Sequence, residues 1–317
     1  MPRRGRRSFA DRRILVTGGS GFIGRRLVAQ LISSGARVVL LHRCSSAIPV
    51  TCDSIMVEQW TPAALEAALR HERFDGIFNL AAYGVAPNAR DRDEMLNVNV
   101  FGVEALLRHA IATRPDFMVH VGSSAEYATR WGTEPLTEAA QLETERLYGL
   151  SKAKASLIVL SRARQERLPC VVARLFGVYG PGEAPHRLLP SLWSRLSSGK
   201  HVALSHGRQV RDMSHVDDVV CGLMALADAA VGASGPILTN LCSGEGVSIA
   251  DFARKVAEIM DVPESLLGFG DLPLRPDDVM HLVGSTQHLR AVSDWRPKLS
   301  LDAGIRATIT ELERQAR

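Results

Sequence analysis

The sequence lacks the patterns that mark membrane, disulfide-stabilised and zinc-binding proteins. No apolar run approaches the length of about 18 residues that a membrane-spanning helix needs, and no apolar signal-peptide core precedes Ile14. The five cysteines are an odd number, lie far apart and form no CxxC pair, so we expect no disulfide framework and no metal site. These absences predict a soluble, cytoplasmic protein without a membrane partner.

A strong excess of charge of one sign is also absent. The formal net charge is +4 over 317 residues, and the one dense basic cluster stands at the start of the chain, at Arg3, Arg4, Arg6, Arg7, Arg12 and Arg13. No stripe of aromatic and basic residues accompanies it, so we expect a solvated tail and no nucleic-acid partner. The weak positive field suits an anionic, phosphate-bearing ligand.

Apolar runs alternate with helical patterns over the first half of the chain. Short runs without polar alternation predict buried strands at 13–17, 37–41, 54–57, 76–81, 117–121 and 170–175. Helical spacing of apolar residues predicts helices at 22–33, 62–70, 93–113 and 145–165. The alternation indicates an α/β protein with a doubly wound parallel sheet, the Rossmann fold.

The regular alternation stops near Tyr179, where glycine and proline become frequent. Helical patterns then recur less regularly, near 188–197, 216–227, 249–260 and 301–314. We expect a Rossmann domain over residues 11–178, to which residues 212–242 return. Residues 179–317 are expected to form mainly a smaller, C-terminal substrate-binding lobe.

A glycine-rich turn joins the first predicted strand to the first predicted helix. Gly18, Gly21 and Gly24 allow, in that order, a tight turn, a close approach of the backbone to a pyrophosphate, and close packing of helix on strand. The helix that starts at Phe22 and Ile23 directs its free N–H groups at the anion. These five residues are therefore predicted to bind a dinucleotide cofactor.

The second predicted strand ends in Leu41-His42-Arg43 and lacks the carboxylate that usually accepts the ribose 2′-hydroxyl of NAD. Arg43 can instead form charge-assisted bonds to a 2′-phosphate, and Ser45 and Ser46 can add hydroxyl donors. We therefore predict that the Rossmann domain binds NADP(H), with NAD(H) left open.

Tyr148 and Lys152 stand four residues apart in a predicted helix, so their side chains leave one face about one turn apart. A free tyrosine has a pKa of about 10 and a nearby ammonium lowers it, so Lys152 can prepare Tyr148 for proton transfer. Ser124 follows the predicted strand 117–121, at the sheet edge where α/β folds bind ligands. The three residues predict proton exchange with a hydroxyl or carbonyl group whose carbon exchanges hydride with a nicotinamide.

Several further motifs follow one another along the chain. They are the turn 18–24 and the segments NLAA (79–82), NVFG (99–102), SSA (123–125), YGLSK (148–152), RLFGVYGP (174–181), RDMSHVDD (211–218) and RPD (275–277). In these motifs the sequence resembles, over almost its whole length, the extended short-chain dehydrogenase/reductase family, in its nucleotide-sugar epimerase, dehydratase and reductase branch. The resemblance implies an NAD(P)-dependent enzyme of carbohydrate biosynthesis that acts on a nucleotide-diphosphate sugar.

The resemblance also implies catalytic roles. Tyr148 would be the general acid/base, Ser124 its hydrogen-bonding partner at the reacting oxygen, and Lys152 the residue that binds the nicotinamide ribose and tunes the tyrosine. Asn99 would support the site from the preceding helix.

Further matches imply binding roles. Ala81 and Ala82 would line the cofactor cleft, and Arg211 and Arg275 would reach the diphosphate of the substrate, for which an arginine fork is suited. Gly177 stands where the family often has an asparagine that contacts the sugar nucleotide, so that contact is in doubt.

The reaction itself depends on residues beside the catalytic serine. Dehydratases of the family commonly have an Asp-Glu pair there, whereas this chain has Ala125-Glu126. One dehydratase subgroup uses the glutamate alone, so Glu126 remains a candidate catalytic and substrate-contacting residue. The stretch 124–127 is similar to that of 4-keto-6-deoxy-sugar reductases, and Arg43 favours NADPH. We predict NADPH-dependent reduction of the 4-keto group of a nucleotide-activated 4-keto-6-deoxy-sugar.

Other readings stay open at this point. The same machinery serves a nucleotide-sugar 4-epimerase or a 4,6-dehydratase with tightly bound NAD(P), and the fold alone also fits a non-catalytic NADP sensor. The nucleotide base and the sugar are not identified. The long helices 93–113 and 145–165 predict a homodimer joined by a four-helix bundle, as in relatives.

Overall fold

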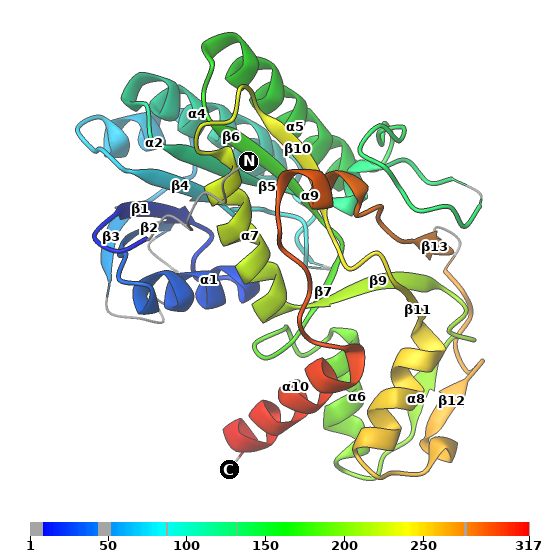
Figure 1. Cartoon of the computed structure of the whole chain (residues 1–317). Coiled ribbons are helices and arrows are strands. Elements are labelled where there is room, and N and C mark those ends of the chain that lie inside the picture. Colours follow the sequence, from blue (N-terminus) through cyan, green and yellow to red (C-terminus); the bar gives the residue numbers. More distant parts are fainter. Residues whose placement is uncertain (1–8, 44–51, 87, 131, 276–277, 317) are drawn as a thin grey trace.

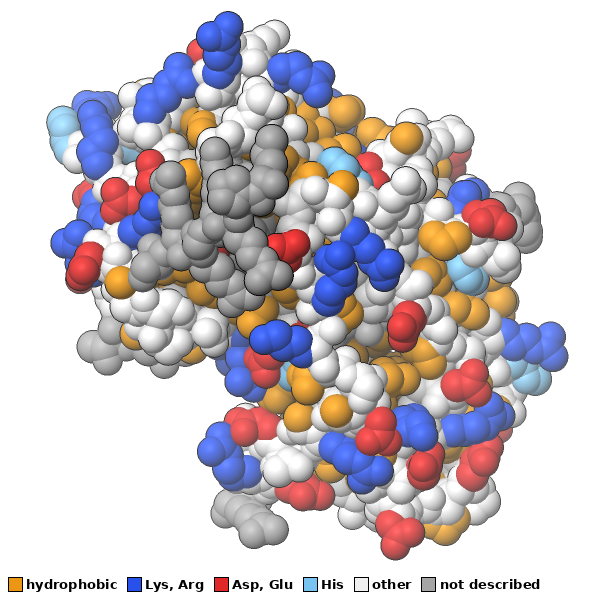
Figure 2. Space-filling view, viewed as in Figure 1, with side chains coloured by type: hydrophobic (Ala, Val, Ile, Leu, Met, Phe, Trp, Pro, Cys, Tyr) orange, Lys and Arg blue, Asp and Glu red, His pale blue; other side chains and the backbone are white. Residues whose placement is uncertain are grey.

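The computed structural model describes residues 9–43, 52–86, 88–130, 132–275 and 278–316. Ser45 and Ser46, two of the predicted cofactor contacts, lie outside the described residues. The described chain forms a larger lobe around one sheet and a smaller lobe, which is drawn below it in Figure 1. On the visible face of the smaller lobe, basic side chains are interspersed with acidic ones (Figure 2).

Seven parallel strands form the sheet of the larger lobe, in the spatial order β10-β6-β5-β4-β1-β2-β3. Their bounds are β1 Arg13–Thr17, β2 Arg37–Arg43, β3 Asp53–Val57, β4 Gly76–Asn79, β5 Phe117–Ser123, β6 Cys170–Leu175 and β10 Ile237–Leu241. The central strands are almost entirely buried, as their continuous apolar runs predict for a sheet covered on both faces. The predicted doubly wound Rossmann fold is confirmed.

Helices cover both faces of this sheet (Figure 1). α1 (Phe22–Ser33) and α7 (Val216–Ala230) share the apolar core of one face. On the other face the core is shared by α2 (Pro62–Leu69), α4 (Gly102–Thr113) and α5 (Leu147–Glu166). The carboxyl ends of the strands stay open between these layers, which is where this fold binds ligands.

The smaller lobe has an apolar core of its own, to which α6, α8 and α10 contribute. Its elements are β7 Gly177–Tyr179, α6 Leu188–Leu196, β8 Val202–Leu204, β9 Val210–His215, β11 Gly246–Ser248, α8 Ile249–Ile259, β12 Leu267–Phe269, β13 His281–Leu282 and α10 Leu301–Ala316. Between β13 and α10, α9 (Gln287–Val292) packs on β10 and contributes Leu289 to the core of the larger lobe. Between β9 and β11 the chain returns to the larger lobe, where it forms α7 and the edge strand β10. The assignment of the two lobes to cofactor and substrate, with the bounds given above, stays a prediction because it concerns ligands.

One predicted helix differs from the structure. Residues 93–113 are not a single regular helix: α3 (Arg92–Leu96) passes through a π-helical turn, Asn97–Phe101, into α4. Short π-helical turns of this kind are frequent at functional sites. Asn99, in the middle of the turn, is fully buried beside α5, so the irregularity lies next to the candidate catalytic helix.

Candidate active site

The glycine turn has the geometry of a pyrophosphate cradle. Gly18 has a left-handed φ of 68°, and a Cβ there would lie 2.7 Å from the backbone carbon of Leu80. A Cβ on Gly24 would overlap the Gly18 carbonyl oxygen, so the third glycine is required for α1 to pack against the turn. Gly21 directly precedes α1, which begins at Phe22. The free N–H groups of the helix therefore point to the space that the turn keeps open.

A cavity of about 200 Å³ adjoins this turn. It is lined by Gly18 and Gly21, by the end of β2 with Arg43, and by residues 80–83, which include Ala81 and Ala82. The arginine pairs with Glu94 at the cavity edge, which holds its guanidinium at the mouth. Five of the predicted cofactor residues, Gly18, Gly21, Arg43, Ala81 and Ala82, thus line one cavity.

Tyr148 lies at the start of α5. The predicted contact of Ser124 with the reacting oxygen of a substrate stays a prediction. The phenol is hydrogen-bonded to the hydroxyl of Ser123, not to that of Ser124. Burial raises the pKa of Tyr148, while the bond to Ser123 and the charge of Arg187 oppose this rise. Tyr148 is therefore a protonated phenol at neutral pH, and the predicted tuning of the tyrosine by Lys152 stays a prediction.

Lys152 is buried one turn further along α5, at 2% exposure. Its Nζ donates to the carbonyl oxygen of Val121 at 2.7 Å, which ties the lysine to the end of β5. Burial lowers the pKa of Lys152 to about 8, although the carboxylate of Glu126 opposes the shift. The ammonium therefore carries its charge at neutral pH and loses it under mildly alkaline conditions.

Asn99 supports the site by positioning other groups and does not contact Tyr148. Its side-chain amide accepts from Tyr83 N at 2.8 Å and donates to Tyr83 O at 2.9 Å. It also donates to the Ser151 hydroxyl at 3.0 Å, which in turn donates to the Tyr148 carbonyl oxygen at 2.8 Å. The π-helical turn is thus fastened both to the cofactor-side loop and to α5.

The role predicted for Glu126 is not supported by its position. The side chain is fully buried, and its Oε2 accepts from Arg174 Nε at 2.8 Å. Its Oε1 accepts from the Ser123 amide at 2.9 Å and from the Ser156 hydroxyl at 3.0 Å. With both oxygens bonded inside the protein, Glu126 cannot contact substrate and is a structural carboxylate.

Ser124 lines a second cavity, of about 130 Å³, between the larger lobe and β13 of the smaller one. The cavity is lined by Ser124, Ala125, Tyr127, Ala128, Thr129, Arg130, Leu136, Arg146, Val279, His281 and Leu282. Neither aspartate nor glutamate occurs among the described residues that line this cavity. Ser124 directly follows Ser123, the residue that is hydrogen-bonded to Tyr148.

The two arginines predicted to bind a diphosphate lie close to a common residue in the smaller lobe. Arg211 is on β9, and its Nη2 lies 4.0 Å from Oδ1 of Asp278. The backbone amide of Asp278 donates to the carbonyl oxygen of the exposed Arg275. The structure therefore brings both guanidinium-bearing residues to one region. Gly177, in β7, packs so closely that a Cβ would lie 2.6 Å from the Asp212 carbonyl oxygen, which explains why no asparagine stands there.

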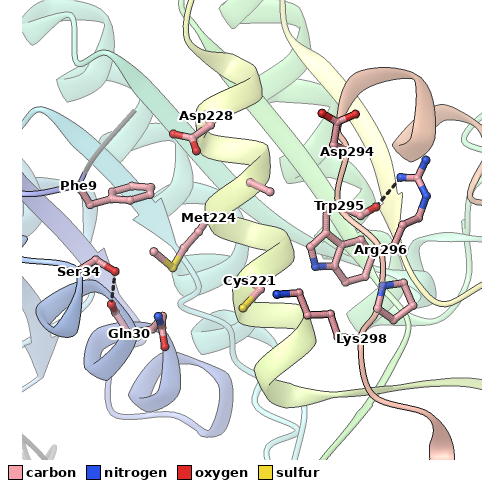
Figure 3. A pocket seen from close by; sticks show the side chains of 12 residues that line it. Phe9, Gln30, Ser34, Cys221, Met224, Asp228, Asp294, Trp295, Arg296 and Lys298 are labelled. Atoms are coloured by element: carbon pink, nitrogen blue, oxygen red, sulfur yellow. Dashed lines mark hydrogen bonds between the residues drawn. The ribbon is translucent and has the colours of Figure 1, made fainter. Parts of the chain in front are cut away.

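A larger cavity, of about 450 Å³, lies away from these residues. It is formed by α1, α7 and the segment 294–298, and Figure 3 shows Met224 and Trp295 among the side chains that line it. None of the predicted site residues lines it. Its size alone does not make it a candidate active site.

Sequence reasoning missed Ser123 and a buried pair that supports the cofactor loop. The Ser-Ser pair offered two candidates, and the choice depends on where β5 ends and the 3₁₀ turn 124–126 begins. Thr17 accepts from the Ala81 amide at 3.1 Å and donates to Asn79 at 2.7 Å. The NLAA motif contained this signal, because its asparagine immediately precedes the predicted cofactor residues.

Within the described part of the chain, no helix is both long and apolar enough to cross a bilayer. The same part holds no cluster of His, Cys, Asp and Glu side chains suited to a metal ion.

Comparison with known proteins places the chain among nucleotide-sugar enzymes. It is 28% identical over 268 residues to dTDP-6-deoxy-L-talose 4-dehydrogenase (NAD(P)(+)) from Kitasatospora kifunensis, with 81% of this chain and 82% of the relative covered. CDP-abequose synthase from Salmonella typhimurium is 26% identical, with 96% and 100% covered. The UDP-glucose 4-epimerase of Thermotoga maritima, solved with UDP-glucose, superimposes with a TM-score of 0.85 at 25% identity, with 96% and 100% covered.

The model of the NAD dependent epimerase/dehydratase family matches residues 14–241, which hold the glycine turn, Ser123, Tyr148 and Lys152. The predicted resemblance to extended short-chain dehydrogenases/reductases and the predicted nicotinamide dinucleotide cofactor are thereby confirmed. The protein is an NAD(P)-dependent, nucleotide-sugar-modifying enzyme, and the chain belongs to the NAD dependent epimerase/dehydratase family.

Proposed function

We propose that the protein reduces the 4-keto group of a nucleotide-activated 4-keto-6-deoxyhexose with NADPH. The observation that carries this proposal is the chemistry around Tyr148. Tyr148 is a protonated phenol, the cavity lined by Ser124 has no carboxylate among its described lining residues, and Glu126 is held in its ion pair with Arg174. A proton donor without an accompanying base suits reduction better than dehydration.

The residues divide the reaction between them. Gly18, Gly21 and Arg43 would hold NADPH in the cavity beside the glycine turn, and when bound it would supply the hydride for carbon 4. Tyr148 donates its proton to the ketone oxygen as that oxygen gains charge, and Ser123 hydrogen-bonds the phenol. Lys152, still protonated at neutral pH, stabilises the resulting phenolate, which regains a proton from solvent. The products are the 4-hydroxy sugar and the oxidised cofactor.

The preference for NADPH rests on Arg43. This side chain lines the cofactor-side cavity and is held there by Glu94, and no carboxylate ends β2. A guanidinium in this position favours a 2′-phosphate over a free ribose hydroxyl. The relative from Kitasatospora is named as a 4-dehydrogenase that uses NAD(P), which supports redox chemistry at carbon 4.

The site also fits a 4-epimerase, because epimerisation needs the same tyrosine and no separate base for water loss. Relatives named as 4-epimerases support this second candidate. Incubation with nucleotide sugars and nucleotide-4-keto-sugars, with and without NADPH, separates the two. A reductase consumes NADPH and yields a product about two mass units heavier than the keto-sugar, because the ketone gains one hydride and one proton. An epimerase converts a nucleotide sugar without net oxidation of NADPH.

The Tyr148→Phe variant tests the proposed proton donor. It should lose turnover of the ketone while it keeps its affinity for NADPH, because only the hydroxyl is removed. Turnover retained at the wild-type rate would refute the assignment. A protein that binds NADPH but converts no nucleotide sugar of the panel would instead be a sensor, the remaining alternative.

A further inference from the structure

A row of buried polar side chains crosses the sheet near the carboxyl ends of three neighbouring strands. Thr17, Asn79 and His120 are paired in register on β1, β4 and β5, and none is more than 1% exposed. Two residues earlier, the same strands carry members of the apolar core shared with α5, namely Leu15, Ile77 and Met118. Because side chains on a strand alternate with period two, the polar row faces the same side, toward α5.

The hydrogen bonds along this row have a fixed direction. The Thr17 hydroxyl accepts from the Ala81 amide, so its own proton goes to Asn79 Oδ1, at 2.7 Å. The Asn79 amide nitrogen then donates to His120 Nδ1, at 3.0 Å. If the side-chain amide of Asn79 were flipped, its NH₂ group would face Thr17, and the Thr17 hydroxyl proton would lose its acceptor. His120 is therefore held as the neutral tautomer with its proton on Nε2.

The buried imidazole of His120 lies within the electrostatic reach of the buried Lys152 ammonium. Burial, and then the charge of Lys152, hold the pKa of His120 well below its ordinary value. The ring nitrogen Nε2 has no hydrogen-bond partner among the described residues. Lys152 is anchored to Val121, the next residue of β5, so the ring and the ammonium lie between the same strand and α5.

We propose that His120 is a positioning residue for Lys152. Asn79 and Thr17 set the tautomer of His120, and the Nε2–H dipole of this imidazole acts on the ammonium of Lys152. The positive end of this dipole opposes the positive charge, so it works with burial to make the lysine release its proton more easily. Glu126, itself neutralised by Arg174, acts in the opposite direction. Through Thr17 the row also connects the lysine to the Ala81 amide of the cofactor loop.

The tautomer can be measured directly, without cofactor or substrate. Long-range ¹H–¹⁵N spectra of protein labelled with ¹⁵N-histidine should show an Nε2–H imidazole that is already neutral at about pH 6, below the ordinary pKa, and stays unchanged up to about pH 9. This signal should vanish in His120→Gln. An Nδ1–H tautomer or an imidazolium at this position would overturn the proposal, whatever reaction the enzyme catalyses.

The effect on the lysine has its own readout. The sequence contains few lysines, at 152, 154, 200, 255 and 298, so ¹³Cε-labelled lysine signals resolve, and Lys152→Arg identifies the buried one. In His120→Leu the titration midpoint of Lys152 should rise from about 8, by roughly half a pH unit or more. His120→Gln keeps an acceptor for the Asn79 amide and therefore preserves the fold. In this variant the titration midpoint of Lys152 should rise by less than in His120→Leu.

His109→Leu is the matched control. His109 also has an Nε2 without a hydrogen-bond partner among the described residues, but it lies in α4 beside Phe74. This variant should lower the unfolding temperature without moving the Lys152 midpoint. If both His120 variants left the midpoint in place, or lowered it, His120 would only fill space and the proposal would fail.

Discussion

Ser123 ends β5, Ser124 begins the 3₁₀ turn that follows, and their side chains contact different neighbours. Ser123 bonds Tyr148, whereas Ser124 lines the cavity between the lobes. The strand and the 3₁₀ turn that follows it point consecutive side chains in different directions. We therefore propose that the Ser123 hydroxyl assists proton transfer and that the Ser124 hydroxyl is available to the substrate.

Replacement of each serine should separate these roles. Ser123→Ala should lower kcat by roughly 10² or more, because it removes a hydrogen bond at the reacting group. Ser124→Ala should mainly raise KM and leave kcat within a few-fold of the wild type. Steady-state kinetics on the keto-sugar identified by the panel measures both. A larger loss of kcat in Ser124→Ala would restore the original sequence-based assignment.

At Arg43 the expected effect concerns cofactor choice. Arg43→Ser should weaken NADPH binding by about 10-fold or more, the value of a charge-assisted contact to phosphate, and leave NADH binding nearly unchanged. Glu94→Gln is the control, since it removes the pairing carboxylate and keeps the arginine. Fluorescence titration with both cofactors gives the constants. Equal losses for NADH and NADPH in Arg43→Ser would contradict a 2′-phosphate contact.

At the scale of single elements, α5 is the helix that the site depends on most. It carries Tyr148 and Lys152, and its Ser151 receives the bond from the π-helical turn. Gly149 allows this helix to approach the loop after β5, because a Cβ there would overlap the carbonyl oxygen of Ala125. The close approach keeps Tyr148 beside Ser123.

Gly149→Ala should therefore lower both stability and activity, although alanine is the better helix former. We expect a loss of about 1–3 kcal/mol in unfolding free energy, typical of overpacking, together with a marked fall in kcat. Gly235→Ala, where nothing lies within 4 Å of an added Cβ, should change neither by much. Urea unfolding and kinetics provide the measurement. A stabilised and fully active Gly149→Ala would show that the helix can shift freely.

At the scale of the whole molecule, the buried ammonium of Lys152 couples stability to pH. Burial lowers its pKa in the folded state to about 8, from the ordinary value of 10.5. Below pH 8 Lys152 is protonated in both the folded and the unfolded state, so the full free-energy cost of burying its ammonium applies. Between these two values the unfolded state binds more protons, so this residue makes folding more favourable as pH rises.

Lys152→Met should therefore be more stable than the wild type at pH 7, and the difference should shrink as pH rises toward 10.5. The change across this window should be about 3 kcal/mol, from the shift in pKa. Urea denaturation at several pH values tests this. Surface Lys154→Met is the control and should show no such trend. A constant difference between Lys152→Met and the wild type would mean that the ammonium is not buried in solution.

The predicted homodimer also belongs to this scale, and it stays a prediction. α4 and α5 pack side by side, and Leu157 on α5 and Phe101 in the π-helical turn are 52% and 42% exposed. Leu157→Arg should convert a dimer into monomers of unchanged fold in analytical ultracentrifugation. Leu272→Arg, at an equally exposed leucine of the smaller lobe, should leave the dimer intact. A monomeric wild-type protein would remove the basis for the four-helix interface.

Local patterns in the sequence determined the secondary structure and most of the fold. The predicted bounds of β1 and β6 agree with the structure, because continuous apolar runs define buried strands. The glycine spacing predicted the cofactor turn, and the four-residue spacing of Tyr148 and Lys152 placed them on one helix face. These features depend on backbone periodicity and short-range sterics, which neighbouring residues fix by themselves.

Only the tertiary structure decided what the neighbouring side chains do. Glu126 is neutralised by Arg174, 48 residues away, and the choice between Ser123 and Ser124 depends on how the end of β5 meets α5. His120 is a strand residue in the sequence pattern, and its polar neighbours Asn79 and Lys152 come from two other elements, β4 and α5. Partners distant in sequence determine the burial, hydrogen bonding and pKa of a side chain, and these quantities leave no local pattern.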